Sequence, residues 1–187
     1  MTALTIYPDT APSNGTHYLE YADIQTQLEA IGVRFERWTA GFELPTNADQ
    51  ETVLQAYRQQ IDRLNDEYGF QSADVIDMQP DHPDKTTLRQ KFLSEHRHDD
   101  FEVRFFIEGC GLFSLHIDDR VYCILCEQGD LISVPAGTRH WFDMGQNPSF
   151  KCIRLFTTPE GWVANFTGSD IAGKFPTLDA YREALIQ

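Results

Sequence analysis

The chain has 187 residues, with 15 lysines and arginines against 29 aspartates and glutamates, which gives a formal net charge of −14. This length suits one domain, and a composition with 41% hydrophobic and 12% aromatic residues excludes general disorder. An acidic surface repels nucleic-acid phosphates and anionic headgroups, and no apolar run is long enough to cross a bilayer, so we expect neither nucleic acid nor a membrane as a partner.

Helical periodicity dominates the first third of the chain. Over residues 16–31, apolar side chains recur with the spacing of a helix. A second helix is predicted over 47–68, with Asn47 as its N-cap. The polar, proline-containing run 77–85 is predicted to be a connection.

From about Ser94 the pattern becomes that of short strands. Runs rich in β-branched and aromatic residues alternate with turn signals, which is typical of a sandwich or barrel. A short helix is predicted over 177–185 in the tail. We therefore predict one β-barrel domain with helices packed outside it. The predicted strands are 101–107, 112–117, 121–125, 131–134, 140–142 and 150–156.

Cys123 and Cys126 have the spacing of a redox motif or of half a zinc ribbon, but the sequence has no second such pair and no disulfide framework. Cys123 and Cys126 lie three residues apart in a predicted strand, so their side chains point to opposite faces. We expect reduced, structural thiols. Because the first residues also lack a signal-peptide pattern, we expect a cytoplasmic protein.

Three histidines and one glutamate form the pattern that carries chemistry. His96, His98 and Glu102 stand at even offsets, so on an extended chain they share a face. His140 ends a second segment, 129–140, just after a Pro-Gly turn. Three imidazoles and one carboxylate suit iron, nickel, cobalt, manganese or zinc, whereas calcium and magnesium prefer oxygen ligands.

These two segments match the two motifs of the cupin family. The first, HxHxxxExxxxxxG, ends at Gly109, and the second, GxxxxxPxGxxH, covers 129–140. Gln90 and Met144 depart from the pattern, where the motifs usually begin with Gly and end with Asn. Most of the chain further resembles the acireductone dioxygenase family, cupins of the methionine salvage pathway. The strings that carry this resemblance are 96–105, 133–143 and 153–156.

The resemblance implies a mainly β fold, a cupin-type double-stranded β-helix (jelly-roll barrel) with packed N-terminal α-helices. We predict a single cupin domain over 1–187. In it, 1–85 form the helical N-terminal part and connection, 86–160 the metal-binding β-barrel core, and 161–187 the C-terminal tail.

The resemblance also implies a ligand set and a reaction. One Fe²⁺ or Ni²⁺ per chain would be held by His96, His98, Glu102 and His140. The family's substrate is acireductone, 1,2-dihydroxy-5-(methylthio)pent-1-en-3-one, which is cleaved by O2. With iron the family forms the 2-oxo acid precursor of methionine plus formate, and with nickel it forms methylthiopropionate, formate and carbon monoxide.

Strand alternation adds candidates around the metal. Arg104 shares the face of Glu102, and Arg154 lies on the last long strand; either could be a catalytic residue that stabilises a bound anion. Phe142 and Trp162 are candidates for an aromatic wall of the substrate pocket. The alternatives are an ion pair at the barrel rim for each arginine and ordinary core packing for the aromatics.

Two other functions fit the same motifs. One is another cupin enzyme, either a different dioxygenase or a sugar-phosphate isomerase in which Arg104 and Arg154 form a phosphate pocket. The other is a non-catalytic cupin that binds a metal or a small ligand. The acidic, well-solvated surface favours a monomer.

Overall fold

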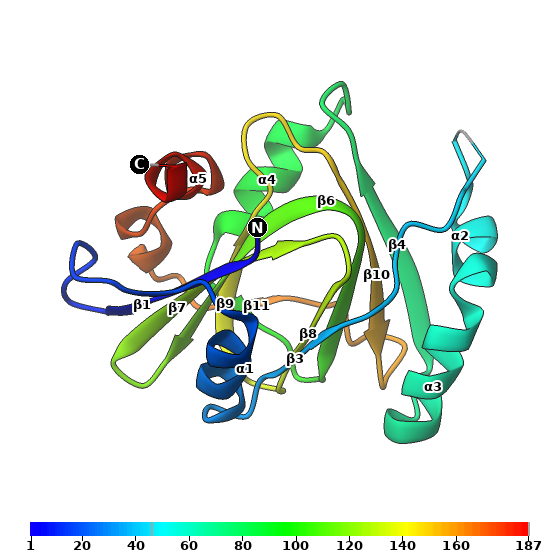
Figure 1. Ribbon diagram of the computed structural model, residues 1–187, viewed down its shortest axis with the longest axis horizontal. Coiled ribbons are helices and arrows are strands. Elements are labelled where there is room, and N and C mark those ends of the chain that lie inside the picture. The colour runs from blue at the N-terminus through cyan, green and yellow to red at the C-terminus, as the bar shows by residue number, and fades with distance from the viewer. Residues whose placement is uncertain (46, 187) are drawn as a thin grey trace.

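The computed structural model describes residues 1–45 and 47–186, and it forms two packed β-sheets with helices on the outside (Figure 1). Thr46 and Gln187, which the predicted domain includes, lie outside the described residues. The strands are β1 (Ala3–Pro8), β2 (Thr16–Tyr18), β3 (Arg34–Arg37), β4 (Ser72–Met78), β5 (His96–Arg97), β6 (Glu102–Ile117), β7 (Arg120–Glu127), β8 (Asp130–Val134), β9 (Arg139–Asp143), β10 (Phe150–Phe156) and β11 (Asn165–Phe166). The helices are α1 (Tyr21–Glu29), α2 (Gln50–Ala56), α3 (Arg58–Tyr68), α4 (Lys85–Leu93), α5 (Leu178–Ile186) and a 3₁₀ turn (Ile171–Lys174).

Strand β6 belongs to both sheets and joins them. Its first half pairs with β8 and β10, in the order β4-β10-β6-β8-β3. Its second half pairs with β7 and β9, in the order β11-β5-β9-β6-β7-β1-β2. The two predicted runs 101–107 and 112–117 are therefore one strand of 16 residues, with Gly109 at a φ of 67° near its middle. The mainly β, cupin-type prediction is confirmed, in the form of a sandwich whose sheets keep free outer edges.

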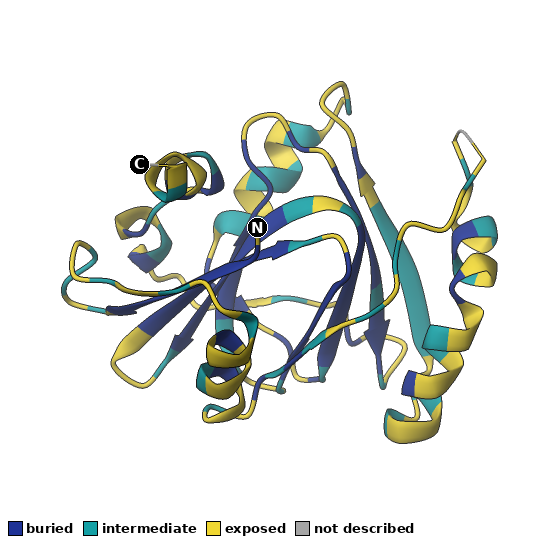
Figure 2. Cartoon of the chain, viewed as in Figure 1, coloured by how far each residue is buried: buried dark blue, intermediate teal, exposed yellow. Residues whose placement is uncertain are grey.

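Three apolar clusters fill the molecule. One lies between the sheets, one joins the outer face of β1 and β7 to the C-terminal tail, and one joins β6, β8 and β10 to α2 and α3. Figure 2 accordingly shows buried strands beneath helices whose outer faces are exposed. Cys123 and Cys126 fall in different clusters, and all four cysteines are free thiols, as predicted. None of the helices in the described ranges is long and apolar enough to cross a membrane.

The helical predictions needed correction at their boundaries. The first helix begins only at Tyr21, because 16–18 pair with β1 as an edge strand. The second is two helices, interrupted at Tyr57, whose ring is buried against Phe105 with centroids 5.6 Å apart. Its N-cap is Asp49, which accepts a hydrogen bond from the Thr52 amide at 2.9 Å. Asn47 was the wrong cap.

The predicted connection 77–85 is shorter than expected. Strand β4 continues to Met78, and α4 begins at Lys85. Neither β4 nor α4 was predicted, and neither were β1 and β3. The tail helix α5 confirms the prediction over 177–185 to within one residue at each end.

Candidate metal centre

The four predicted ligands meet at one end of the sandwich. His96 on β5 lies directly opposite His140 on β9, with ring centroids 4.4 Å apart. One ring nitrogen from each of His96, His98 and His140 lies within 4.8 Å of the other two. Glu102, the first residue of β6, places Oε2 3.4 Å from Nε2 of His140 and 3.7 Å from Nε2 of His98.

The alternation of side chains along a single strand does not explain how these four residues come together. Strand β5 ends at Arg97, so His98 lies in a loop rather than on a strand continuous with Glu102. This loop is held by the second motif, because the amide of Gly137 donates to the carbonyl of His98 at 2.8 Å. Gly137 has a φ of 77°, which favours glycine at this turn.

All three imidazoles present the same nitrogen to the centre. In each ring Nδ1 lies within hydrogen-bond distance of a backbone carbonyl, which accepts only from Nδ1–H. This bond fixes the tautomer and leaves the lone pair on Nε2 available for a metal. The distances are 2.7 Å from His96 to Ser94, 2.9 Å from His98 to Val163 and 2.8 Å from His140 to Thr138.

Burial and charge keep these groups in the protonation states that a metal requires. Burial, with the neighbouring His140, lowers the pKa of His96 to about 3, and burial also lowers the pKa of His98. For Glu102, burial alone would raise the pKa, but Arg104 and the imidazoles hold it well below its usual range. We therefore expect neutral imidazoles at His96 and His98 beside an ionised Glu102, which is the state that binds a divalent ion.

Two buried atoms of this group lack a partner. Oε2 of Glu102 and Nε2 of His140 have no hydrogen-bond partner among the described residues. Since buried polar atoms are almost always satisfied, lone pairs that face one another without a proton donor point to a cation. Three nitrogens and one oxygen fit a borderline divalent metal such as iron, nickel or zinc.

Arg104 is buried beside the ligands rather than at the rim. Its Nε donates to Oε1 of Glu102 at 2.8 Å, which leaves Oε2 directed at the imidazoles. The guanidinium carbon lies 4.8 Å from the ring centroid of Phe113 and 4.9 Å from that of Phe142. Its Nη1 has no hydrogen-bond partner within the part of the chain that the structure describes.

The other predicted residues have different surroundings. Arg154 also lines the cavity, and its Nε and Nη2 lie 2.9 and 2.6 Å from the carboxylate of Asp74. Phe142 is fully buried against Phe113, with centroids 5.0 Å apart, and is not among the residues that line the cavity. Trp162 does line the cavity and is half exposed.

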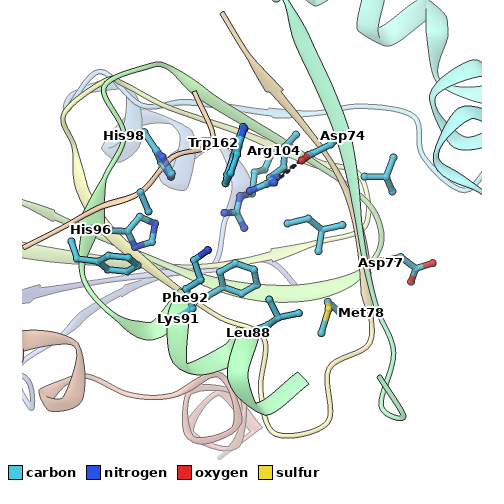
Figure 3. Close-up of a pocket in the computed structure, with 15 residues that line it drawn as sticks. Asp74, Asp77, Met78, Leu88, Lys91, Phe92, His96, His98, Arg104 and Trp162 are labelled. Carbon is cyan, nitrogen blue, oxygen red and sulfur yellow. Dashed lines mark hydrogen bonds and ion pairs between the residues drawn. The ribbon is translucent and has the colours of Figure 1, made fainter. Parts of the chain in front are cut away.

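A cavity of about 410 Å³ leads to the centre (Figure 3). His96, His98 and Arg104 line one end, and Met78, Leu88 and Phe92 line an apolar part on the side away from His98. The sequence reasoning missed these apolar residues because β4 and α4 were not predicted. Helix α4 has no fully buried residue, and its sequence shows no clear apolar stripe. Helical periodicity therefore did not reveal it.

Comparisons with known proteins identify the family of this chain. Residues 3–164 match the model of the ARD/ARD' family. An acireductone dioxygenase of Methylococcus capsulatus is 59% identical over 181 residues, which is 97% of each chain, and that of Aquifex aeolicus is 62% identical over 157 residues, 84% of this chain and 86% of its own. A solved acireductone dioxygenase from Bacillus anthracis with a cadmium ion in its active centre has a TM-score of 0.77 and 28% identity, over 89% of this chain and 98% of that one. The chain therefore belongs to the ARD/ARD' family.

Proposed function

We propose that this protein is a metal-dependent acireductone dioxygenase of the methionine salvage pathway, which cleaves 1,2-dihydroxy-5-(methylthio)pent-1-en-3-one with O2. One Fe²⁺ or Ni²⁺ per chain would be held by His96, His98, Glu102 and His140. The observation that carries the proposal is the set of inward-facing donors, two of them unpartnered, at one end of a cavity. With iron we expect 4-methylthio-2-oxobutanoate and formate. With nickel we expect 3-(methylthio)propanoate, formate and carbon monoxide.

The chain prepares this end of the cavity for an anionic enediol. A metal held by the four ligands would supply Lewis acidity to the enediol oxygens. Arg104 aligns Glu102 through Nε and keeps Nη1 free to donate to an anionic oxygen. Arg154 is the weaker candidate for this role, because its Nε and Nη2 both already donate to Asp74.

The rest of the cavity suits the substrate's thioether tail. Met78, Leu88 and Phe92 offer an apolar surface on which a methylthio group can exclude water. Trp162 lies on the cavity wall, where its indole can cover a bound tail. Phe142 supports the site indirectly, because its ring packs against the guanidinium of Arg104.

The test is turnover by separately loaded forms of the protein. Apoprotein would be loaded with Fe²⁺ or Ni²⁺, and O2 uptake and products would be measured with acireductone. His98→Ala should abolish turnover, whereas His82→Ala, a change in the loop before α4, should not. Full activity in His98→Ala would contradict the proposal. Anaerobic turnover of a sugar phosphate would favour the isomerase, and a metal-loaded protein that consumed no O2 would favour the non-catalytic cupin.

We also propose that the protein acts as a monomer in the cytoplasm. The net charge of −14 supports the monomer, because like-charged copies of the chain repel one another. Size-exclusion chromatography with light scattering should give the mass of one chain, 21.5 kDa. A mass of twice that value would contradict the monomer.

A further inference from the structure

One of the three imidazoles is oriented by a distant part of the chain. Nδ1 of His96 and Nδ1 of His140 each bond to a carbonyl two residues earlier in the same segment. Nδ1 of His98 instead bonds to the carbonyl of Val163, which is 65 residues further along the chain. The orientation of His98 therefore depends on where the backbone at Val163 is held.

Val163 belongs to a segment, residues 157–167, that we call the strap. The strap contains β11, in which Phe166 pairs with His96 of β5. Trp162 and Phe166 line the cavity, and the Phe166 ring centroid lies 5.8 Å from that of His96. The strap therefore forms part of the cavity wall beside the ligands.

Asp100 holds the first end of the strap. Its carboxylate accepts hydrogen bonds from the hydroxyl of Thr157, and from the amide and the hydroxyl of Thr158 at 2.8 and 3.1 Å. It also accepts from the amide of Phe101 at 2.7 Å, which fixes the carboxylate in its own loop. Asp100 is buried although it is charged, and these donors compensate for its lost hydration.

Glu95 holds the second end. Its Oε1 accepts from the hydroxyl of Thr167 at 2.7 Å, and its backbone carbonyl accepts from the Thr167 amide at 3.0 Å. Its Oε2 lies 2.8 Å from Nδ1 of His116, so the buried carboxylate is fixed from the opposite side as well. Glu95 and Asp100 flank the HxH segment that carries the first two ligands.

We propose that Glu95 and Asp100 are positioning residues, which clamp the two ends of the strap and so hold the Val163 carbonyl that orients His98 toward the metal. Packing contributes little to the position of the strap, because its large apolar side chains are about half exposed: Trp162 52%, Val163 46% and Phe166 50%. Loss of an anchor should therefore loosen the strap without unfolding the sheets. This inference rests on the proposed function, which it extends to residues outside the ligand set.

The experiment measures release of Ni²⁺ from the loaded protein into an excess of a chromophoric chelator. Thr167→Val removes the hydroxyl that Glu95 accepts from and keeps the shape of the side chain, whereas Thr167→Ser keeps the hydroxyl. Residues that support metal ligands typically contribute 10–100-fold to affinity, so Thr167→Val should release Ni²⁺ about tenfold faster or more. Thr167→Ser should release it at close to the wild-type rate, and Thr157→Val, at the other anchor, should resemble Thr167→Val.

Asn165→Ala is the matched control, because Asn165 lies exposed on the same strap and its side chain makes no hydrogen bond to the described residues. Hydrogen exchange of the apoprotein should show faster exchange at amides 160–166 in Thr167→Val and Thr157→Val, but not in Thr167→Ser or Asn165→Ala. The inference is overturned if Thr167→Val releases Ni²⁺ as slowly as Asn165→Ala, or if Thr167→Ser is as fast as Thr167→Val. If the rates separate as expected but the wild type consumes no O2 with acireductone, the clamp stands and the proposed function fails.

Discussion

Replacing Arg104 with methionine tests whether the guanidinium keeps Glu102 ionised and aligned. Arg104 is only 2% exposed, and its Nε donates to Oε1 of Glu102 at 2.8 Å. Methionine retains much of the side-chain volume against Phe113 and Phe142 but removes the charge and the donor. In the apoprotein, the variant therefore leaves a buried carboxylate without its cation.

This change should have two measurable effects, one on stability and one on metal affinity. Removing one partner of a buried ion pair costs about 3–5 kcal/mol in the free energy of unfolding, so the Tm of the apoprotein should fall by about 6–20 °C in a domain of this size. The pKa of Glu102 should also rise, because burial raises it and Arg104 is the main group that lowers it. A proton then competes with the metal, and Ni²⁺ affinity should fall about tenfold per pH unit below the new pKa.

The assay combines thermal unfolding of the apoprotein with Ni²⁺ titrations between about pH 5 and pH 8. Arg154→Met is the matched control. Its partner Asp74 is 39% exposed and stays hydrated when the arginine is removed, so we expect a loss of at most about 1 kcal/mol. An Arg104→Met apoprotein that melts with the control, and binds Ni²⁺ like the wild type at every pH, would refute the reasoning.

Three further predictions concern other parts of the molecule. Burial raises the pKa of Asp143, but hydrogen bonds from Arg89 and two backbone amides outweigh it and lower the pKa. Asp143→Asn should therefore be less stable than the wild type to urea at neutral pH, and the difference should shrink as the pH falls below about 4; a difference that grew in acid would contradict this. At Gly111 an added Cβ would overlap the Phe142 ring. Gly111→Ala should therefore lower the free energy of unfolding in urea by about 1–3 kcal/mol. An unchanged urea midpoint would show that the ring can move. Trp162→Ala should leave Tm unchanged but raise KM for acireductone, and an unchanged KM would remove Trp162 from the pocket.

The clustering of the three histidines and Glu102 could be predicted because its signal is local. The even offsets of His96, His98 and Glu102, and the Pro-Gly turn before His140, each lie within a short stretch of sequence. The fold class followed from the same stretch, since turn residues divide the strands at regular intervals. Even there, strand alternation alone did not place His98, because the loop after Arg97 is held by a hydrogen bond from Gly137 that no local pattern reveals.

The cavity walls could not be predicted because they depend on contacts between distant segments. Strand β4 pairs with β10, about 80 residues later, and only this pairing brings Met78 toward the metal centre. The partner of Arg154 was missed for the same reason, since Asp74 lies opposite it in that pair of strands. The Val163 carbonyl carries no side-chain signal, so its role could not be found from sequence patterns.

The two ligands that differ most in how their backbone is held are Glu102 and His98. Glu102 begins a strand that pairs along its length with four neighbours, so its backbone can separate only when the whole sandwich opens. His98 lies in a loop whose side chain is fixed from a half-exposed segment. We therefore expect the His98 side of the site to fluctuate more than the Glu102 side.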